Sequence, residues 1–431
     1  MIVRPETFEE RMVWYAITCT YLFFLAGALY VLAPALAWTV VAVWVWRQTG
    51  PDGEAAGSTL PLTVLLWLAG MLAMQFALLV AHVDFSLGIG QTMKSSIGWA
   101  KGWALLALFP LIGCMAIRPE ILYRAACILS AQTLFIALPL AVLGYLAGVP
   151  EVLYVSPLQA VGGPGPEFFD VSIYSINPDN GMPRWRLFTP WGPALGFVGA
   201  VYFFLALHEK SPGWRIVGMA SALAMVVASG SRLGLVAIPA VLGASWVITH
   251  IRQPSLHWLA AAVFLIAGLF GLQLFDFAEF LQERFHAARP ESSRVRAILG
   301  RIAIDRWLDE AVIWGHGVVE KGPHLVEFMP IGSHHSWYGL LFVKGIVGFA
   351  ALAVPMAWSA VDLLRRHNAR PAAKPAFQLL LLLFLYSFGE NLEILAYLFW
   401  PALVMIGIAL RGALKTSRPA AHNKKLEETF A

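Results

Sequence analysis

The sequence predicts an all-α polytopic membrane protein. Of its 431 residues, 59% are hydrophobic and only 13% are charged, and the mean hydropathy is +0.69. Soluble proteins are about half apolar and about one quarter charged, so this composition excludes a soluble globular enzyme, a disordered chain and a disulfide scaffold. The net charge of +4 reflects the bias of membrane loops towards lysine and arginine rather than nucleic-acid binding.

Twelve apolar runs predict about twelve transmembrane helices, since a helix needs about 20 apolar residues to cross a bilayer. They fall at 13–29, 31–46, 60–82, 97–117, 122–147, 190–208, 213–229, 232–250, 257–275, 336–360, 376–394 and 396–411. In the first two runs, Pro34 and small residues such as Gly27 favour a tight hairpin of two short helices. Residues 1–411 are therefore expected to form a single transmembrane domain, followed by a polar cytoplasmic tail, 412–431.

The positions of lysine and arginine predict the orientation. With twelve spans, both termini lie on the same side, and more than half of the lysines and arginines fall in the short loops and tails of that side. Such loops stay in the cytoplasm, so both termini are expected to be cytoplasmic. Two long segments, 148–189 and 276–336, then lie on the outer, periplasmic side, and loops this long are usually functional or disordered.

The two long segments differ in character. The first is rich in proline and glycine and is expected to be mostly irregular. The second separates the ninth and tenth spans, and its residues 292–314 predict an amphipathic helix that lies along the outer membrane boundary or packs on the helix bundle. The expected apolar stripe consists of Ile298, Ile302, Trp307 and Val312, with Ser292 or Ser293 as the helix cap.

Arginines on the outer side predict an anion site. Arg186 directly precedes a span, Arg232 lies in a very short turn between two spans, and Arg294 and Arg296 lie in the long loop. Guanidinium groups form bidentate pairs with phosphate oxygens, and these segments all open on one face; Arg296 is favoured over Arg294. The alternatives are headgroup anchoring for Arg186, snorkelling for Arg232 and a solvated helix face for the loop arginines.

Two adjacent histidines, His334 and His335, stand at the mouth of the tenth span and predict a catalytic base. Imidazole is the usual general base near neutral pH, and His334 is favoured. The alternatives are a structural role or zinc, but adjacent histidines chelate one ion poorly and no HExxH occurs, so no metal is expected. Neither GxxxxGK[ST] nor GxGxxG is present, so no nucleotide or other cofactor is expected.

Other polar groups near the outer ends of spans are expected to be structural. Glu390, Asn391 and Glu393 lie at the outer end of the penultimate span, where capping of a helix is favoured over a functional role. Lys344 lies near the top of a span and is expected to snorkel towards water.

Four stretches, in this order and topology, resemble the O-antigen ligase and O-antigen polymerase superfamily, which are bacterial membrane glycosyltransferases of the GT-C type. The stretches are RLFTPWGPALGF, SGSRLGLVA, SSRVRAILGRIAIDRWLDEAVIWGHG and GSHHSWYGLLFVKGIVG. The resemblance covers mainly residues 180–350. It implies a metal-independent, inverting transfer of a glycan from undecaprenyl diphosphate at the periplasmic face of the inner membrane.

The acceptor that the resemblance implies depends on the branch of the family. A ligase attaches the polymer to lipid A-core, whereas a polymerase adds it to another lipid-linked glycan, for which a chain-length regulator is a possible partner. The motifs look slightly closer to O-antigen or capsule polymerases. The remaining alternatives are a polysaccharide transporter or flippase, which would place charged or broken helices at mid-membrane, and a non-catalytic assembly scaffold.

Residue by residue, the resemblance implies that arginines hold the diphosphate and a histidine activates the acceptor hydroxyl. Arg186 matches the family arginine before the sixth span, Arg296 or Arg294 the loop arginine, and His334 the loop histidine. Arg232 matches a Ser-Arg pair in many members. The family often has His-Asn-Ser where this chain has His334-His335-Ser336, so either histidine is a candidate base.

Overall fold

The computed structural model describes residues 3–49, 60–176, 181–255, 257–258, 261, 290–326, 328–332 and 335–411. Within these residues, seven helical segments are long and apolar enough to cross a membrane, and three shorter apolar helices accompany them. The segments are Leu29–Thr49, Leu62–Asp84, Gly88–Gly113, Pro119–Leu146, Arg232–His250, Ser336–Arg366 and Leu392–Leu410, with Gly192–Leu207, Pro212–Ala228 and Ala373–Tyr386 as the shorter ones. The protein is therefore an all-α membrane protein.

The N-terminal apolar stretch folds as two limbs, but the break differs from the expected one. Helices α1 (Phe8–Thr18) and α2 (Thr20–Leu25) lead into a turn at Gly27, and α3 (Leu29–Thr49) returns. Gly27 has φ +63° and a Cβ there would lie 2.3 Å from the Cβ of Ser156, so only glycine fits this turn. The prediction that Pro34 helps to separate the two helices is wrong, because Pro34 lies inside α3.

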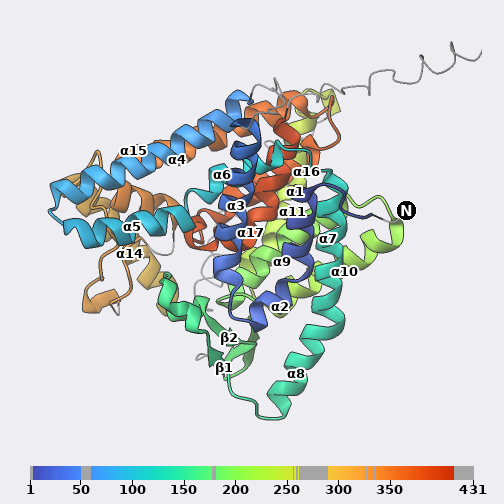
Figure 1. The fold of residues 1–431 in the computed structure, drawn as a ribbon, viewed down its shortest axis with the longest axis horizontal. Coiled ribbons are helices and arrows are strands. Elements are labelled where there is room, and N and C mark those ends of the chain that lie inside the picture. Colours follow the sequence, from blue (N-terminus) through green and yellow to red (C-terminus); the bar gives the residue numbers. More distant parts are fainter. Residues whose placement is uncertain are drawn as a thin grey trace, which may run out of the picture.

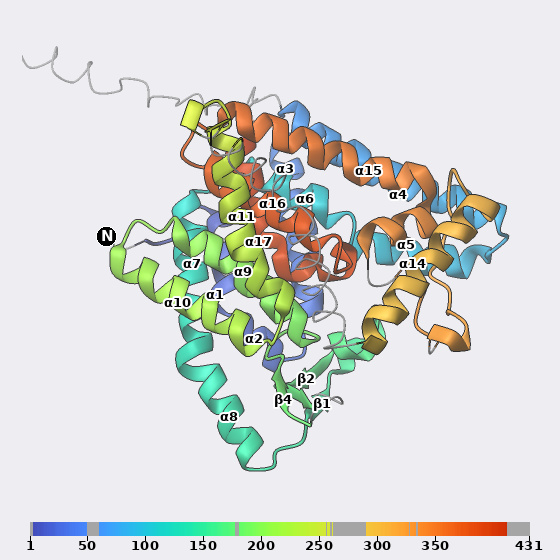
Figure 2. The same ribbon diagram turned by 180° about the vertical axis from the view of Figure 1, so that it is seen from behind.

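Helix α17 (Leu392–Leu410) lies at the centre of the bundle (Figures 1 and 2), and every residue from Leu395 to Leu410 is buried. It packs on α6 (Leu105–Gly113), α16 (Ala373–Tyr386) and α9 (Gly192–Leu207). At the α6 contact, a Cβ on Gly407 would lie 2.1 Å from the Pro110 carbonyl oxygen. The helices approach this closely because glycine has no side chain, as is common between membrane helices.

Helices α4 (Leu62–Asp84) and α15 (Ser336–Arg366) run side by side away from the rest of the bundle (Figures 1 and 2). The predicted tenth span is not one continuous helix, because α15 is broken at Gly345 (φ 59°, ψ −160°). Residues 312–317 fill the break: Ile346 N–H donates to the Val312 carbonyl (2.9 Å), and His316 N–H to the Phe342 carbonyl (2.9 Å). The backbone groups freed by the break are thereby satisfied within the protein.

The remaining spans form longer or shorter units than expected. Helix α5 (Gly88–Lys101) begins nine residues before the predicted fourth span and leads through a turn at Gly102 into α6. The predicted fifth span consists of α7 (Pro119–Gln132), a π-helical turn η1 (Thr133–Ala137) and α8 (Leu138–Leu146). Helices α10 (Pro212–Ala228) and α11 (Arg232–His250) match two predicted spans. Most of the predicted run 257–275 lies outside the described residues.

The segment 148–189 is more regular than expected. Strand β1 (Val152–Val155) pairs with β2 (Asp170–Ser172), and β3 (Tyr174–Ile176) pairs with β4 (Pro183–Trp185), both antiparallel. Two short 3-10 helices, η2 (Pro157–Val161) and η3 (Pro166–Phe168), lie between β1 and β2. These pairs lie beside the lower end of the bundle in Figure 1. They place Arg186 directly after a paired strand.

The predicted amphipathic helix is present as α14 (Pro290–Glu310), and it packs on α15. Its most buried apolar residues are Leu299 and Ala303, which form a small core with Phe342 of α15. Ile298 and Ile302 flank this core as predicted, whereas the helix ends before Val312, which is exposed. The prediction that Ser292 or Ser293 caps this helix is wrong, because α14 already begins at Pro290 and both serines lie inside it.

The cations expected on the cytoplasmic side gather at one end of the bundle. The contacts join Arg47 to Glu9 (2.8 Å), Arg118 to Glu10 (2.8 Å), Arg366 to the Leu410 carbonyl (2.8 Å) and Arg411 to the Ile117 carbonyl (2.9 Å). These residues come from the starts of α1 and α7 and the ends of α3, α15 and α17. These four arginines therefore lie at one end of the bundle, while the tail 412–431 lies outside the described residues.

Candidate functional site

Three polar side chains lie at the start of α17 and just before it. Glu393 and Tyr397 are four residues apart in the helix and share one side of it, and Glu390 precedes the cap Asn391; we call these three residues the α17 stripe. Asn391 accepts a hydrogen bond from the Glu393 N–H (2.9 Å) and caps the helix, as predicted. Glu390 lies in the connection that precedes the cap and is only 8% exposed.

Each member of the α17 stripe interacts electrostatically with a cation from a different part of the chain. The electrostatic neighbours are Arg296 of α14 for Glu390, Lys344 of α15 for Glu393, and Arg186 of the loop before α9 for Tyr397. Glu393 and Tyr397 are about 6 Å apart along the helix axis at 1.5 Å per residue, and Glu390 directly precedes the cap. The structure therefore brings Arg186 and Arg296, which are 110 positions apart, to the same short stretch of α17.

Arg186 is buried and held by backbone carbonyls. It is 9% exposed, and it donates from Nε to the Thr189 carbonyl (3.4 Å) and from Nη2 to the Glu167 carbonyl (3.2 Å). Burial lowers the pKa of Arg186, while the nearby carboxylate of Asp170 opposes this change. Because an arginine stays charged in proteins, this is a fixed positive group next to the bundle and not a freely moving headgroup anchor.

Arg296 lies on α14 beside a cavity of about 70 Å³, and Arg294 does not line that cavity. The lining includes Arg296, Leu299, Gly300, His335, Tyr338 and Phe388; we call it the α14–α15 cavity. Both arginines are exposed, but two residues along a helix turn the side chain by about 200°. Of the two predicted alternatives, Arg296 is thus the one that lines the α14–α15 cavity beside His335.

His335 caps α15, and this position weakens it as a base. Its Nδ1 accepts a hydrogen bond from the Tyr338 N–H (3.4 Å), its ring stacks on Tyr338 (centroids 4.0 Å apart), and Phe388 meets it edge-on. Burial lowers the pKa of His335 to about 4, so the ring is neutral at pH 7 but has little driving force to accept a proton. The other candidate base, His334, lies outside the described residues.

Arg232 begins α11, and its turn adjoins the segment that leads into α17. Ser231 caps α11 by accepting the Gly234 N–H (3.1 Å). A Cβ on Gly389 would lie 2.9 Å from Leu233, so the turn packs directly against the residue before Glu390. Arg232 is half-buried and therefore belongs to the same region as the other predicted cations.

Lys344 does not snorkel as expected. It is 3% exposed and lies at the break in α15, where Glu393 and His82 are its charged or titratable neighbours. Glu393 also packs on the turn that separates α5 from α6, where a Cβ on Gly102 would lie 2.5 Å from the Glu393 Cγ. Lys344 is buried because α15 bends at the following residue and its side chain is covered by the neighbouring helices.

The other polar groups of the long loop serve the fold. Arg306 binds Glu310 (2.7 Å) and Glu320 (2.6 Å), and Arg306 and then His316 lower the pKa of Glu310 to about 2. His316 is 1% exposed, with Nδ1 3.0 Å from the Phe342 carbonyl oxygen and Nε2 2.8 Å from Glu310. These groups fix the turn at 315–317 against the broken α15.

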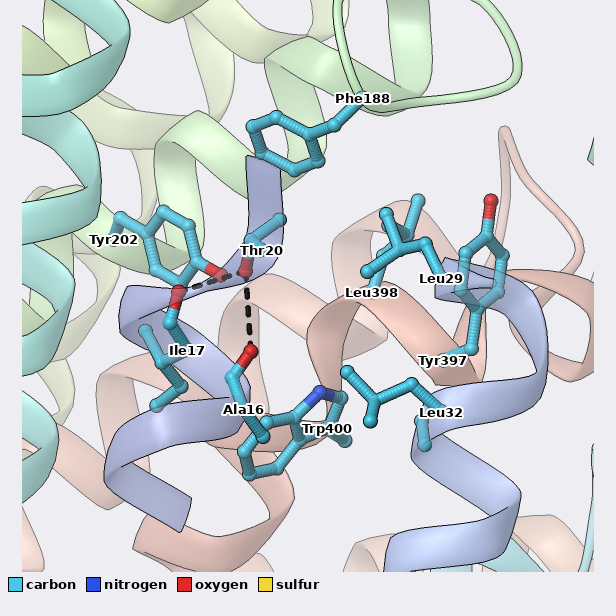
Figure 3. Close-up of a pocket in the computed structure, with 11 residues that line it drawn as sticks. Ala16, Ile17, Thr20, Leu29, Leu32, Phe188, Tyr202, Tyr397, Leu398 and Trp400 are labelled. Atoms are coloured by element: carbon cyan, nitrogen blue, oxygen red, sulfur yellow. Dashed lines mark hydrogen bonds between the residues drawn. The ribbon is translucent and has the colours of Figure 1, made fainter. Parts of the chain in front are cut away.

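Small cavities adjoin the α17 stripe near Tyr397. Figure 3 shows one of about 10 Å³, with the Thr20 hydroxyl donating to the carbonyls of Ala16 and Ile17 and the side chains of Tyr202 and Tyr397 on its wall. A cavity of this size holds about one water molecule. It is too small for a sugar or a phosphate.

Sequence reasoning assigned Glu390 and Glu393 to structural roles and missed their positions opposite cations. The available signal was the pair of carboxylates three residues apart at the start of an apolar span, because ionisable groups at membrane depth are costly and mark functional sites. Within the described residues, no group of three or more His, Cys, Asp or Glu side chains is arranged to hold a metal ion. The chain matches no protein-family model and no curated protein.

Proposed function

We propose that the protein transfers a glycan from an undecaprenyl-diphosphate-linked donor to a glycan acceptor at the periplasmic face of a bacterial inner membrane. The supporting observation is the gathering of Arg186, Arg296 and Lys344 opposite the α17 stripe. The motif resemblance supplies the reaction class. Twelve spans, with both termini in the cytoplasm, form part of the proposal.

The cations suit a lipid diphosphate donor. When the sugar leaves, negative charge develops on the diphosphate, and fixed guanidinium groups stabilise it without a metal or nucleotide. Arg186 and Arg296 supply this charge, with Arg232 next to them. His334 is the proposed base that takes the proton from the acceptor hydroxyl, because the low pKa of His335 disfavours it.

An apolar groove provides room for the lipid tail of the donor. It has a volume of about 480 Å³ and lies between α1–α2 and the η1–α8 segment. Leu187, which directly follows Arg186, lines the groove together with Leu22, Leu25, Ile136 and Leu140. A tail in this groove would therefore place its head group at the arginine.

Transfer by the purified protein tests this function. With an undecaprenyl-diphosphate-linked glycan and a glycan acceptor, we expect R296A to lower the rate about 10²-fold, the usual loss when one charge-stabilising donor is removed. R294A is the matched control and should remain close to wild type, since Arg294 lies off the α14–α15 cavity. H334A should abolish transfer. Equal rates for R296A and R294A would contradict the proposed site.

The acceptor is identified in a deletion strain by lipopolysaccharide gels. A ligase deletion leaves lipid-linked polymer that is not attached to lipid A-core. An O-antigen polymerase deletion leaves a single attached repeat unit. Intact lipopolysaccharide with missing capsule indicates a capsule polymerase, and in either polymerase case a chain-length regulator is the partner to seek.

A transporter is the second candidate, because one observation favours it. The buried Lys344 and the half-buried Glu393 lie where α15 is broken and where α5 turns into α6, and transporters commonly place binding sites at broken helices. Reconstituted liposomes that carry a fluorescent lipid-linked glycan distinguish the two candidates. Movement of the glycan across the bilayer, without transfer to an acceptor, would favour the transporter.

A further inference from the structure

Three separate parts of the chain enclose the α14–α15 cavity. It is lined by Arg296 and Gly300 of α14, by His335 and Tyr338 at the start of α15, and by Phe388 of the α16–α17 connection. The proposed transfer gives a binding role only to Arg296. The aromatic side chains that meet it here therefore need an explanation of their own.

Aromatic rings form one wall of this cavity. His335 stacks on Tyr338, with an interplanar angle of 16°, and Phe388 lies perpendicular to His335 with the ring centroids 5.6 Å apart. Tyr338 is 38% exposed and Phe388 is 49% exposed, so the fold leaves part of both rings uncovered. Binding pockets commonly combine such rings with a few polar groups. The C–H groups of a sugar ring pack well on this wall, whereas a free phosphate gains nothing from it.

Arg296 places a positive charge at the edge of the aromatic wall. Its side chain is exposed, and within the part of the chain that the structure describes it forms no hydrogen bond or salt bridge. Arg306 on the same helix differs, because it is bound by Glu310 and Glu320. A guanidinium group with its donors available binds phosphate oxygens. The cavity therefore suits a ligand in which a phosphate is joined to a ring with an apolar face.

The cavity has room for one sugar ring. Its volume is about 70 Å³, enough for about five to seven water molecules at about 10–15 Å³ each. One pyranose ring replaces a similar amount of water, whereas an oligosaccharide is too large. Glycine at position 300 contributes to this room, since a Cβ there would lie 2.9 Å from the Tyr338 Cε2.

We propose that the α14–α15 cavity binds the first sugar of the lipid-linked donor, with its phosphate at Arg296 and its ring against Tyr338 and Phe388. This assignment rests on the proposed function, which supplies the donor. A sugar held on both sides has its anomeric carbon fixed between the aromatic wall and the bound phosphate. The same contacts select the donor by its first sugar, because each ring substituent must fit the small cavity.

Binding to the full-length protein in detergent tests this sugar subsite. The probes are farnesyl diphosphates whose terminal phosphate carries glucose, galactose or N-acetylglucosamine. The reference carries a methyl group instead, so that the charge on the diphosphate is the same. Calorimetry gives the dissociation constants, and we call the ratio of the reference to the tightest sugar probe the sugar gain. For wild type we expect a sugar gain of about three- to tenfold, the usual contribution of an aromatic contact.

Phe388 and Phe384 form the matched pair of variants. Phe384 of α16 is 47% exposed, much like Phe388, but does not line the cavity. F388A should lower the sugar gain to about one, and F384A should keep it. F388L, which retains apolar bulk without an aromatic face, should also lose the gain and replaces F388A if that variant does not fold. R296A should weaken binding of all four compounds by at least about tenfold, because it removes a charged partner of the phosphate.

The outcomes separate this subsite from the proposed function. If wild type binds the reference and all three sugar probes equally, the cavity is a phosphate site alone and the sugar subsite is overturned. A sugar gain that survives in both F388A and F388L also overturns it. If wild type binds none of the four compounds, the proposed donor site falls as well. The expected sugar gain without glycan transfer overturns only the proposed function.

Discussion

Single residues at the start of α17 show how position decides the role of a carboxylate. Asn391 caps the helix, as its sequence position suggests, because its side chain reaches the Glu393 N–H. Glu390 and Glu393 instead interact electrostatically with Arg296 of α14 and Lys344 of α15. Two acids within four residues thus have charged neighbours that are distant in sequence, which a local pattern does not reveal.

His335 allows a test of whether a histidine at this position caps a helix or moves a proton. H335A removes the acceptor for the Tyr338 N–H and should lower the free energy of unfolding by about 1 kcal/mol. H335N keeps an acceptor at the cap and should recover most of this loss. Denaturation in detergent measures both variants, and transfer by H335N at near the wild-type rate would support His334 as the base. A stable H335N that has lost transfer would assign the base to His335.

The broken helix α15 shows how one element creates a site at membrane depth. Its break at Gly345 exposes backbone groups that residues 312–317 satisfy. The same break buries Lys344 beside Glu393. Irregular backbone is tolerated inside a membrane protein when the protein itself covers it, so the turn at 315–317 and the break depend on each other.

Gly345 is required at this break. Its φ of 59° with ψ −160° is a conformation for glycine alone, and a Cβ there would lie 2.2 Å from the Ile313 carbonyl oxygen. G345A should therefore destabilise the protein by about 1–3 kcal/mol. The control is G98A in α5, where a Cβ meets nothing within 4 Å and where alanine stabilises a helix by up to about 1 kcal/mol. Equal unfolding midpoints for G345A and G98A would contradict this prediction, because they would show that a Cβ at position 345 does not strain the broken helix.

For the whole molecule, hydropathy predicted most of the helices, because each apolar span is a local property of the sequence. The amphipathic α14 was also predictable from its periodicity. The break at Gly345 and the β-strand pairs were not, since both depend on contacts with distant segments such as 312–317. Similarly, the arginines were visible in the sequence by their charge, whereas the electrostatic neighbours Tyr397 of Arg186 and Glu390 of Arg296 depend on the packing of the bundle.

The arrangement of charges at the two ends of the bundle predicts which residues face the periplasm. Arg365 lies near the end of α15, at the end where Arg366 contacts the Leu410 carbonyl, while Leu153 of β1 is 43% exposed in the predicted outer segment. In a background where Cys19, Cys114 and Cys127 are replaced by serine, a membrane-impermeant thiol reagent should label L153C in intact spheroplasts. R365C should react only after the membrane is permeabilised, because short lysine- and arginine-rich loops stay in the cytoplasm. The reverse pattern would place the α17 stripe on the cytoplasmic side, where no periplasmic glycan donor could reach Arg186 or Arg296.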